Sequence, residues 1–311
     1  MRNRMNPFVL ARCRGMLCII AVCIFVCFSV PMLAQESIVE PGAEVEVLAD
    51  GFSFTEGPAA DSKGNVYFTD QPNDRILIWS VDGNLSTFRQ PAGRSNGLSF
   101  ETGGNLWACA DEKGELWNIS PEGDISVILD GYNGKRFNGP NDIWIAPGGG
   151  IYFTDPFYPR DYWKHTSMTQ DAQCVYYLAP GKKNPIRVAD DLRQPNGIIG
   201  TPDGKMIYIA DIGARKTYRY DIRSDGTLSG RELFCEMGSD GMTIDNEGNV
   251  YLTGMGVTVY NPKGERIHTI SVQASWTANV CFGGKDLRTL FITASEKLLG
   301  LKMRVQGVGS E

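Results

Sequence analysis

Histidine is nearly absent from this chain, which has only His165 and His268 among its 311 residues. A serine hydrolase of the triad type needs a histidine base, so few side chains could complete one. The stretch Gly93-Arg-Ser-Asn-Gly97 does match the G-x-S-x-G pattern, but that pattern requires a strand before it and a helix after it. Leu-Ser-Phe and a glycine turn follow instead, which predicts that Ser95 is a turn residue rather than a nucleophile.

Cysteines with the spacing of a metal or redox site are also missing. Four of the eight cysteines lie in the N-terminal segment, and no CxxC pair occurs among the others, which are Cys109, Cys174, Cys235 and Cys281. In an oxidising compartment these four allow three pairings. Cys109 and Cys281 lie in strand-like segments, where we expect them to pack as small apolar residues.

No block of lysine and arginine occurs in the body of the chain, and the whole chain has a formal charge of −6. Residues 1–34 contain four arginines and no acids, so their removal would bring the charge to about −10. An acidic body of this kind argues against nucleic acid as a partner and against a basic membrane-docking surface.

The N-terminal segment has the pattern of a secretory signal. Arginines precede an uncharged apolar run over residues 16–30, and Met32-Leu33-Ala34 offers a small-residue cleavage site. We therefore predict a signal peptide over residues 1–34 and a periplasmic or secreted protein without membrane contact after cleavage. The alternative is an uncleaved anchor, because residues 16–34 are mostly apolar and a spanning helix needs about 20 residues. Residues 35–311 are predicted to form a single domain.

Helix-length stretches with a 3.6-residue period are absent, and a short repeated unit is present instead. The fullest copy runs from Asn141-Asp142 through an apolar strand and a glycine turn to a second apolar strand, Ile151–Asp155. The copies are spaced by 40, 45, 55, 44 and 39 residues, and they begin at Glu56, Asn96, Asn141, Asn196, Asp240 and Asn279. A period in this range is typical of solenoids and propellers.

Each unit supplies three short strands rich in Val, Ile, Tyr and Phe, and the first five units supply a fourth, which predicts an all-β, six-bladed β-propeller. The sixth unit ends without a fourth strand, and the unpaired strand at residues 44–48 can complete it and close the ring. Since neighbouring strands are antiparallel, the first residues of all units must surround one mouth of the central channel. The connection over residues 156–173 is long enough to overhang that mouth, and it contains Tyr162 and Trp163, which either touch substrate or pack.

Two carboxylates and four carboxamides begin the six units, and none is His or Cys. Such an all-oxygen ring suits a hard divalent ion, Ca²⁺ ahead of Mg²⁺ or Mn²⁺. The alternative is that the Asn-Gly and Asp-Gly pairs are ordinary turn dipeptides. The repeat by itself leaves both interpretations open.

Several short stretches resemble the gluconolactonase / senescence-marker-protein / luciferin-regenerating-enzyme family, over residues 45–302. They are Thr55-Glu-Gly-Pro58, Lys135-Arg-Phe-Asn138, Pro140-Asn-Asp142, Ile151-Tyr-Phe-Thr-Asp-Pro156, Gln194-Pro-Asn-Gly197, Asp240-Gly-Met242 and Asn279-Val-Cys-Phe-Gly-Gly284. The resemblance implies a six-bladed propeller with a catalytic Ca²⁺ in the channel mouth, or with Mg²⁺, Mn²⁺ or Zn²⁺ in its place.

The resemblance also implies roles for single residues. Glu56, Asn196 and Asp240 match metal ligands, and Asp240 also matches a general base or nucleophile. Asn141 matches a ligand of some members and lies where it could also touch substrate. Arg136 and Asn138 match a pair that contacts substrate in lactone-hydrolysing members. The functional histidine that some members have in the sixth blade has no counterpart here.

These observations predict a metal-dependent hydrolase in which water attacks the polarised carbonyl of a sugar lactone. The alternatives are a hydrolase of organophosphates or non-sugar lactones, and a non-catalytic exported binding propeller. The carboxylates of Glu56 and Asp240 favour an enzyme, because a docking module has no need of them at its axis.

Overall fold

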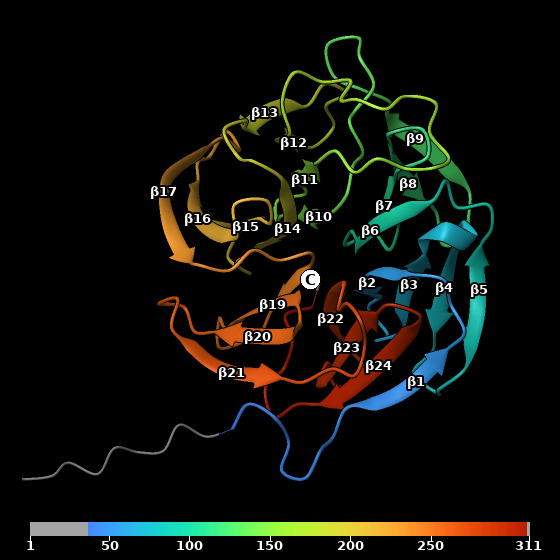
Figure 1. Cartoon of the computed structure of the whole chain (residues 1–311), viewed down its shortest axis with the longest axis vertical. Coiled ribbons are helices and arrows are strands. Elements are labelled where there is room, and N and C mark those ends of the chain that lie inside the picture. Colours follow the sequence, from blue (N-terminus) through green and yellow to red (C-terminus); the bar gives the residue numbers. More distant parts are fainter. Residues whose placement is uncertain (1–36, 310–311) are drawn as a thin grey trace, which may run out of the picture. The chain divides into compact units, whose positions relative to one another are not determined.

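Short strands joined by glycine and aspartate turns form six four-stranded antiparallel sheets around a central axis (Figure 1). The computed structural model describes residues 37–309. Blade one comprises β2 (Thr55–Ala60), β3 (Val66–Asp70), β4 (Arg75–Trp79) and β5 (Leu85–Arg89). Blade two comprises β6 (Ser95–Phe100), β7 (Leu106–Ala110), β8 (Glu115–Ile119) and β9 (Ile125–Leu129). Blade three comprises β10 (Ile143–Ile145), β11 (Ile151–Asp155), β12 (Cys174–Leu178) and β13 (Ile186–Ala189).

The remaining blades repeat this order. Blade four comprises β14 (Pro195–Gly200), β15 (Met206–Asp211), β16 (Lys216–Ile222) and β17 (Leu228–Cys235). Blade five comprises β18 (Met242–Ile244), β19 (Val250–Gly254), β20 (Gly256–Tyr260) and β21 (Arg266–Ile270). Blade six comprises β22 (Asn279–Gly283), β23 (Thr289–Ala294), β24 (Lys297–Lys302) and the early strand β1 (Glu46–Asp50). The predicted six-bladed propeller is therefore confirmed.

The ring closes as predicted, through an N-terminal strand beside the last one. β1 pairs antiparallel with β24, with Glu46 opposite Gly300 and Asp50 opposite Lys297. The strand lies two residues later than the predicted 44–48, because Leu48 and Ala49 both pack toward the core of this blade. A Cβ at position 300 would lie 2.9 Å from Leu48 Cδ1, so glycine leaves room for that side chain.

Helix is confined, within residues 37–309, to the short 3-10 turn η1 (Gln71–Asn73). None of the helical structure in that part of the chain has the length and apolar character needed to cross a membrane. The predicted signal peptide or anchor at residues 1–34 lies outside the described residues.

The cores lie between neighbouring blades. Tyr67 of blade one, for example, meets Phe88 of the same blade and Phe100 of blade two edge to face, with ring centroids 5.1 and 4.9 Å apart. The four body cysteines are all buried and unpaired, so none of the three conceivable disulfide pairings is formed. Cys109 and Cys281 pack in the cores, as predicted.

β-Bulges at the start of the inner strands turn polar side chains toward the axis. The register shifts between Glu56 and Ala59 in β2, between Ser95 and Leu98 in β6, and between Pro195 and Ile198 in β14. Bulges re-aim side chains in this way beside functional sites. The Asn-Gly pairs of β6 and β14 are thus parts of strands, and the turn-dipeptide interpretation is wrong for them. Ser95, predicted to be a turn residue, is the first residue of β6.

Glycines at or just before the inner strands let neighbouring blades touch through their backbones. The Gly97 amide donates a hydrogen bond to the Asn141 carbonyl at 2.7 Å, and the Gly241 amide donates to the Ala278 carbonyl at 2.8 Å. A Cβ at position 97 would lie 2.5 Å from the Asn141 carbonyl oxygen and 2.8 Å from the Cα of Asp142. Close approach, rather than turn geometry, therefore accounts for this glycine.

We expect Gly97→Ala to lower the free energy of unfolding by roughly 2–4 kcal/mol, because the methyl group forces two blades apart. The matched control is Gly148→Ala, since a Cβ at position 148 meets nothing within 4 Å. Urea unfolding of both variants measures the difference. Equal stability of the two variants would show that the inner ring is looser than its backbone contacts indicate.

Candidate functional site

Polar side chains from blades one, four and five meet at one mouth of the channel. The inner strands of neighbouring blades contact one another around the axis, which brings these residues together (Figure 1). Asn196 Nδ2 donates a hydrogen bond to Asp240 Oδ1 at 2.7 Å. Trp276 Nε1 donates to Asp240 Oδ2 at 2.6 Å. Both oxygens of Asp240 are thus held by N–H donors, one from blade four and one from the connection between blades five and six.

Glu56 lies beside this pair. Its side chain is 3% exposed, and its Oε2 accepts a hydrogen bond from the Gly57 amide at 3.0 Å. Burial raises the pKa of Glu56 well above its usual value, and the charge of Asp240 raises it further. Burial also raises the pKa of Asp240, to about 6. Two carboxylates that are 184 positions apart therefore lie close enough to repel each other in a buried site.

Unpartnered acceptors lie in the same ring. Asn196 Oδ1 and Asn96 Oδ1 are buried and accept no hydrogen bond. A buried amide oxygen without a donor is costly, and a cation would satisfy it. Within residues 37–309, no three side chains of His, Cys, Asp or Glu form a metal cluster. The candidate donors Glu56, Asp240 and Asn196 are instead two carboxylates and one amide, an all-oxygen set that fits a hard divalent ion.

The remaining ring positions differ from one another. Asn141 is 4% exposed, and its backbone joins blades two and three. The Asn279 Oδ1 accepts a hydrogen bond from the Val280 amide at 2.8 Å, so it is occupied by its own strand. Asp142 is a third buried carboxylate, which sequence reasoning missed. Burial raises its pKa to about 7, although the Ile143 and Ile198 amides donate to it.

The long connection after β11 extends from blade three over blade two, to which it is tied (Figure 1). Asp111, which follows β7, accepts hydrogen bonds at Oδ2 from Arg160 Nε at 2.9 Å and from the Tyr162 hydroxyl at 2.5 Å. Its carbonyl accepts a third bond, from Trp163 Nε1, at 3.1 Å. On the other side, the Tyr158 hydroxyl accepts a bond from Asn196 Nδ2 at 2.9 Å. The connection therefore forms a fixed cover beside the candidate metal ligands.

Asn138 holds this cover in place. Its side chain is 0% exposed, its Nδ2 donates to the Ala172 carbonyl at 2.9 Å, and its Oδ1 accepts from the Gln170 amide at 3.0 Å. Both ends of the amide are occupied, so in this conformation Asn138 has no accessible polar atom to offer a substrate. Its predicted contact with substrate stays a prediction, and the role visible in the structure is to position the connection.

Tyr162 and Trp163 likewise serve to anchor the cover. The Tyr162 hydroxyl is bonded to Asp111, and Trp163 is 9% exposed, with its ring 4.8 Å from the Arg136 guanidinium and stacked on His165 at 4.6 Å. These contacts show that both side chains pack in the cover, and their predicted contact with substrate stays a prediction. Arg136 is half-buried and donates to the Asp111 carbonyl at 2.9 Å.

Sequence reasoning did not single out Tyr158, Arg160 or Trp276 as functional residues. Trp276 precedes the sixth inner strand by three positions, and its indole N–H bonds Asp240. It thus lies next to the blade in which some family members have a functional histidine and this chain has none. Tyr158 and Arg160 follow a buried strand end in the long connection. The length of that connection was the one signal that pointed to them.

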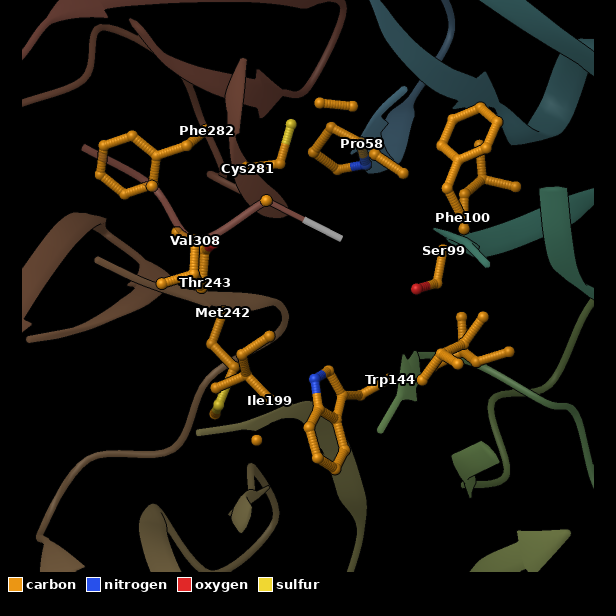
Figure 2. Close-up of a pocket in the computed structure, with 18 of the residues that line it drawn as sticks. Pro58, Ser99, Phe100, Trp144, Ile199, Met242, Thr243, Cys281, Phe282 and Val308 are labelled. Atoms are coloured by element: carbon orange, nitrogen blue, oxygen red, sulfur yellow. The ribbon is translucent and has the colours of Figure 1, made fainter. Parts of the chain in front are cut away.

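A cavity of about 680 Å³ continues along the channel beyond the ring (Figure 2). Its walls include Phe100, Trp144 and Phe282, and the Ser99 hydroxyl points into it. Asp142 and Asn279 lie at its inner end. The lining residues follow the ring residues along the inner strands, so this cavity lies on the other side of the ring from the candidate site.

Fold and site together define a class of protein: a six-bladed propeller that gathers carboxylate and amide oxygens at one mouth of its channel. The chain belongs to the family described as SMP-30/Gluconolactonase/LRE-like region, whose model matches residues 54–296.

Individual relatives agree with this assignment. A gluconolactonase of Zymomonas mobilis is 28% identical over 303 residues, which cover 88% of this chain and 85% of the relative. A pentonolactonase, XacC, of Haloferax volcanii is 33% identical over 243 residues, covering 72% of this chain and 79% of the relative. Among solved structures, a gluconolactonase of Xanthomonas campestris superposes with a TM-score of 0.80 at 26% identity, covering 86% of this chain and 91% of its own.

Proposed function

We propose that this protein is a divalent-metal-dependent hydrolase that opens sugar lactones by adding water to their carbonyl group. The relatives named gluconolactonase and pentonolactonase support a sugar lactone as the substrate. The single observation that carries the proposal is that Glu56, which is buried, and Asp240, which is partly buried, repel each other beside the unpartnered oxygen of Asn196. Two such carboxylates without a cation would oppose folding, so an ion bound there would explain the arrangement.

Glu56, Asn196 and Asp240 would hold the ion, with Asn141 as a further oxygen donor. Ca²⁺ suits such donors best, and Mg²⁺ or Mn²⁺ could replace it, whereas zinc usually has nitrogen or sulfur ligands. When bound, the ion would polarise the lactone carbonyl and stabilise the negative charge that develops on its oxygen.

Asp240 acts as the general base in this proposal. It takes a proton from the water molecule that attacks the carbonyl carbon, and it returns that proton to the ring oxygen as the carbon–oxygen bond breaks. The product is the open hydroxy acid, so one water is consumed per lactone. Trp276 and Asn196 hold the carboxylate by its two oxygens and thereby fix its direction.

Arg136 is proposed to hydrogen-bond the hydroxyl groups of the sugar at the edge of the mouth. Asn138, Tyr162 and Trp163 support it indirectly, because they hold the connection against which Arg136 packs. Displacing that connection by 1 Å is enough to cost about 100-fold in rate when it orients the substrate.

Chelation tests the metal dependence. We expect EDTA to abolish enzymatic opening of D-glucono-1,5-lactone, measured as proton release above the spontaneous rate, and added Ca²⁺ to restore it. The reason is that the ion supplies most of the stabilisation of the oxyanion. Titration of Ca²⁺ into the chelated protein by calorimetry provides a control that is independent of activity. Full activity in EDTA, with no heat of Ca²⁺ binding, would contradict the proposal.

A further inference from the structure

Three arginines gather at the blade-two side of the mouth, although the chain as a whole has a formal charge of −6. Arg160 donates to the Asp111 carboxylate and Arg136 to the Asp111 carbonyl, both at 2.9 Å. The Arg94 guanidinium lies 4.5 Å from the ring of Tyr162, whose hydroxyl bonds the same carboxylate. Glu112 lies 4.0 Å from Arg94, and the charges of Asp155 and Glu115 also act on Arg136. Acids therefore accompany these arginines, and the feature of this side of the mouth is the gathering of three guanidinium groups.

Arg160 has hydrogen-bonding capacity that the protein does not use. Its Nε bonds Asp111, but its two terminal nitrogens bond no other residue in the described part of the chain. The side chain is 24% exposed, so solvent or a ligand reaches it. The equivalent pair in blade one is different. There Arg75 donates both Nε, at 3.0 Å, and Nη2, at 2.8 Å, to Asp70.

Arg160 also lies near the candidate metal ligands without touching them. Its guanidinium is 5.6 Å from the ring of Tyr158, and the hydroxyl of Tyr158 bonds Asn196. Burial raises the pKa of Glu56 and of Asp240, and the charge of Arg160 partly opposes both shifts. A group bound to Arg160 would therefore lie beside the reacting carbonyl rather than on it.

We propose that Arg160 is a specificity-determining residue that binds an anionic group of the lactone, remote from its carbonyl, and that the enzyme prefers anionic sugar lactones to neutral ones. This inference rests on the proposed function and names the substrate class for that same site. A guanidinium with two free N–H edges matches the oxygens of a carboxylate or of a phosphate ester, and charge-assisted bonds of this kind are strong. Asp111 holds the arginine in position before the substrate arrives.

The test compares one neutral and two anionic probes with the Ca²⁺-loaded enzyme: D-glucono-1,5-lactone, D-glucaro-1,4-lactone and 6-phospho-D-glucono-1,5-lactone. Each value of kcat/KM is expressed relative to wild type, so intrinsic differences between the lactones cancel. For Arg160→Gln we expect a loss of roughly 10- to 100-fold with the anionic lactones, mainly through KM, and less than about threefold with the neutral one. Arg160→Lys should recover part of the loss, because it keeps the charge but not the fork.

Arg75→Gln is the matched control, since it removes an arginine of the same face whose donors are already occupied. It should change kcat/KM for all three lactones by the same factor. Salt provides a second readout: 0.5 M NaCl should reduce the preference of wild type for anionic lactones and leave that of Arg160→Gln unchanged. A loss confined to one anionic probe would support the proposal and identify the anion that is recognised.

Two outcomes would overturn the inference. If Arg160→Gln slows all three lactones equally, the residue merely holds the connection in place. If wild type opens none of the lactones, the proposed function fails, and calorimetry with methyl β-D-glucuronide against methyl β-D-glucoside then decides the inference by itself. Binding of the glucuronide that is lost in Arg160→Gln would uphold an anion site, and equal binding of the two sugars would exclude it.

Discussion

Asp240→Asn should reduce kcat for lactone opening by about 10³-fold or more, while the propeller stays folded. An asparagine cannot take the proton from water, and loss of a general base alone costs about 10²–10⁴-fold. The substitution also removes one negative ligand of the proposed ion, which adds to the loss. The measurement is initial rate against Ca²⁺ concentration, so that weaker binding and slower chemistry are separated.

The matched control for this substitution is Asp245→Asn in the same blade. Asp245 is fully buried, whereas Asp240 is partly buried, and Asp245 accepts hydrogen bonds from Tyr251 and Asn249. We expect this control to lower the melting temperature and to leave kcat within about threefold of wild type. Should the Asp240 variant, saturated with Ca²⁺, turn over at the wild-type rate, the base must be another group.

Glu56→Gln should weaken Ca²⁺ binding by at least roughly 100-fold. Removing a group that only supports a metal ligand costs about 10- to 100-fold in affinity, and removing a charged ligand itself should cost more. The same substitution should stabilise the metal-free protein at pH 8, by on the order of 5 °C in melting temperature. The two effects have opposite signs for one reason. Burial and the charge of Asp240 raise the pKa of Glu56, so ionised Glu56 is unfavourable unless a cation is present.

The pH dependence follows from the direction of this shift. A carboxyl group whose pKa is higher in the folded state contributes stability below its unfolded pKa, near 4.5, and loses it as the pH rises through the folded value. The advantage of Glu56→Gln in EDTA should therefore be largest at pH 8 and vanish as the pH falls toward 4.5. Calorimetric scans at four pH values measure this, with Glu122→Gln at the surface as a control that should change nothing. Lower stability of Glu56→Gln than wild type in EDTA at pH 8 would be incompatible with a repulsive pair.

Only the contacts between distant segments revealed which side chains hold the long connection in place and which keep free hydrogen-bonding groups for a ligand. Asp111 and Arg160 belong to different repeats, and so do Asn196 and Asp240. Such pairs depend on the path of a loop and on side-chain rotamers, neither of which follows the repeat. For this reason the sequence could not show that Asn138, Tyr162 and Trp163 hold the connection, and their contact with substrate stays a prediction.

The sequence by itself determined the number of blades, the closing strand and the oxygen-bearing residue at the start of each inner strand. These are local and periodic properties, because strand alternation and turn residues repeat with every blade. Tertiary structure decided the rest: the bulges that turn Glu56 and Asn196 to the axis, the repulsion between Glu56 and Asp240, and the free edge of Arg160. Each of these arises from the close approach of segments distant in the chain. Packing between such segments decides which polar groups find a hydrogen-bond partner and which do not, and no local sequence pattern encodes it.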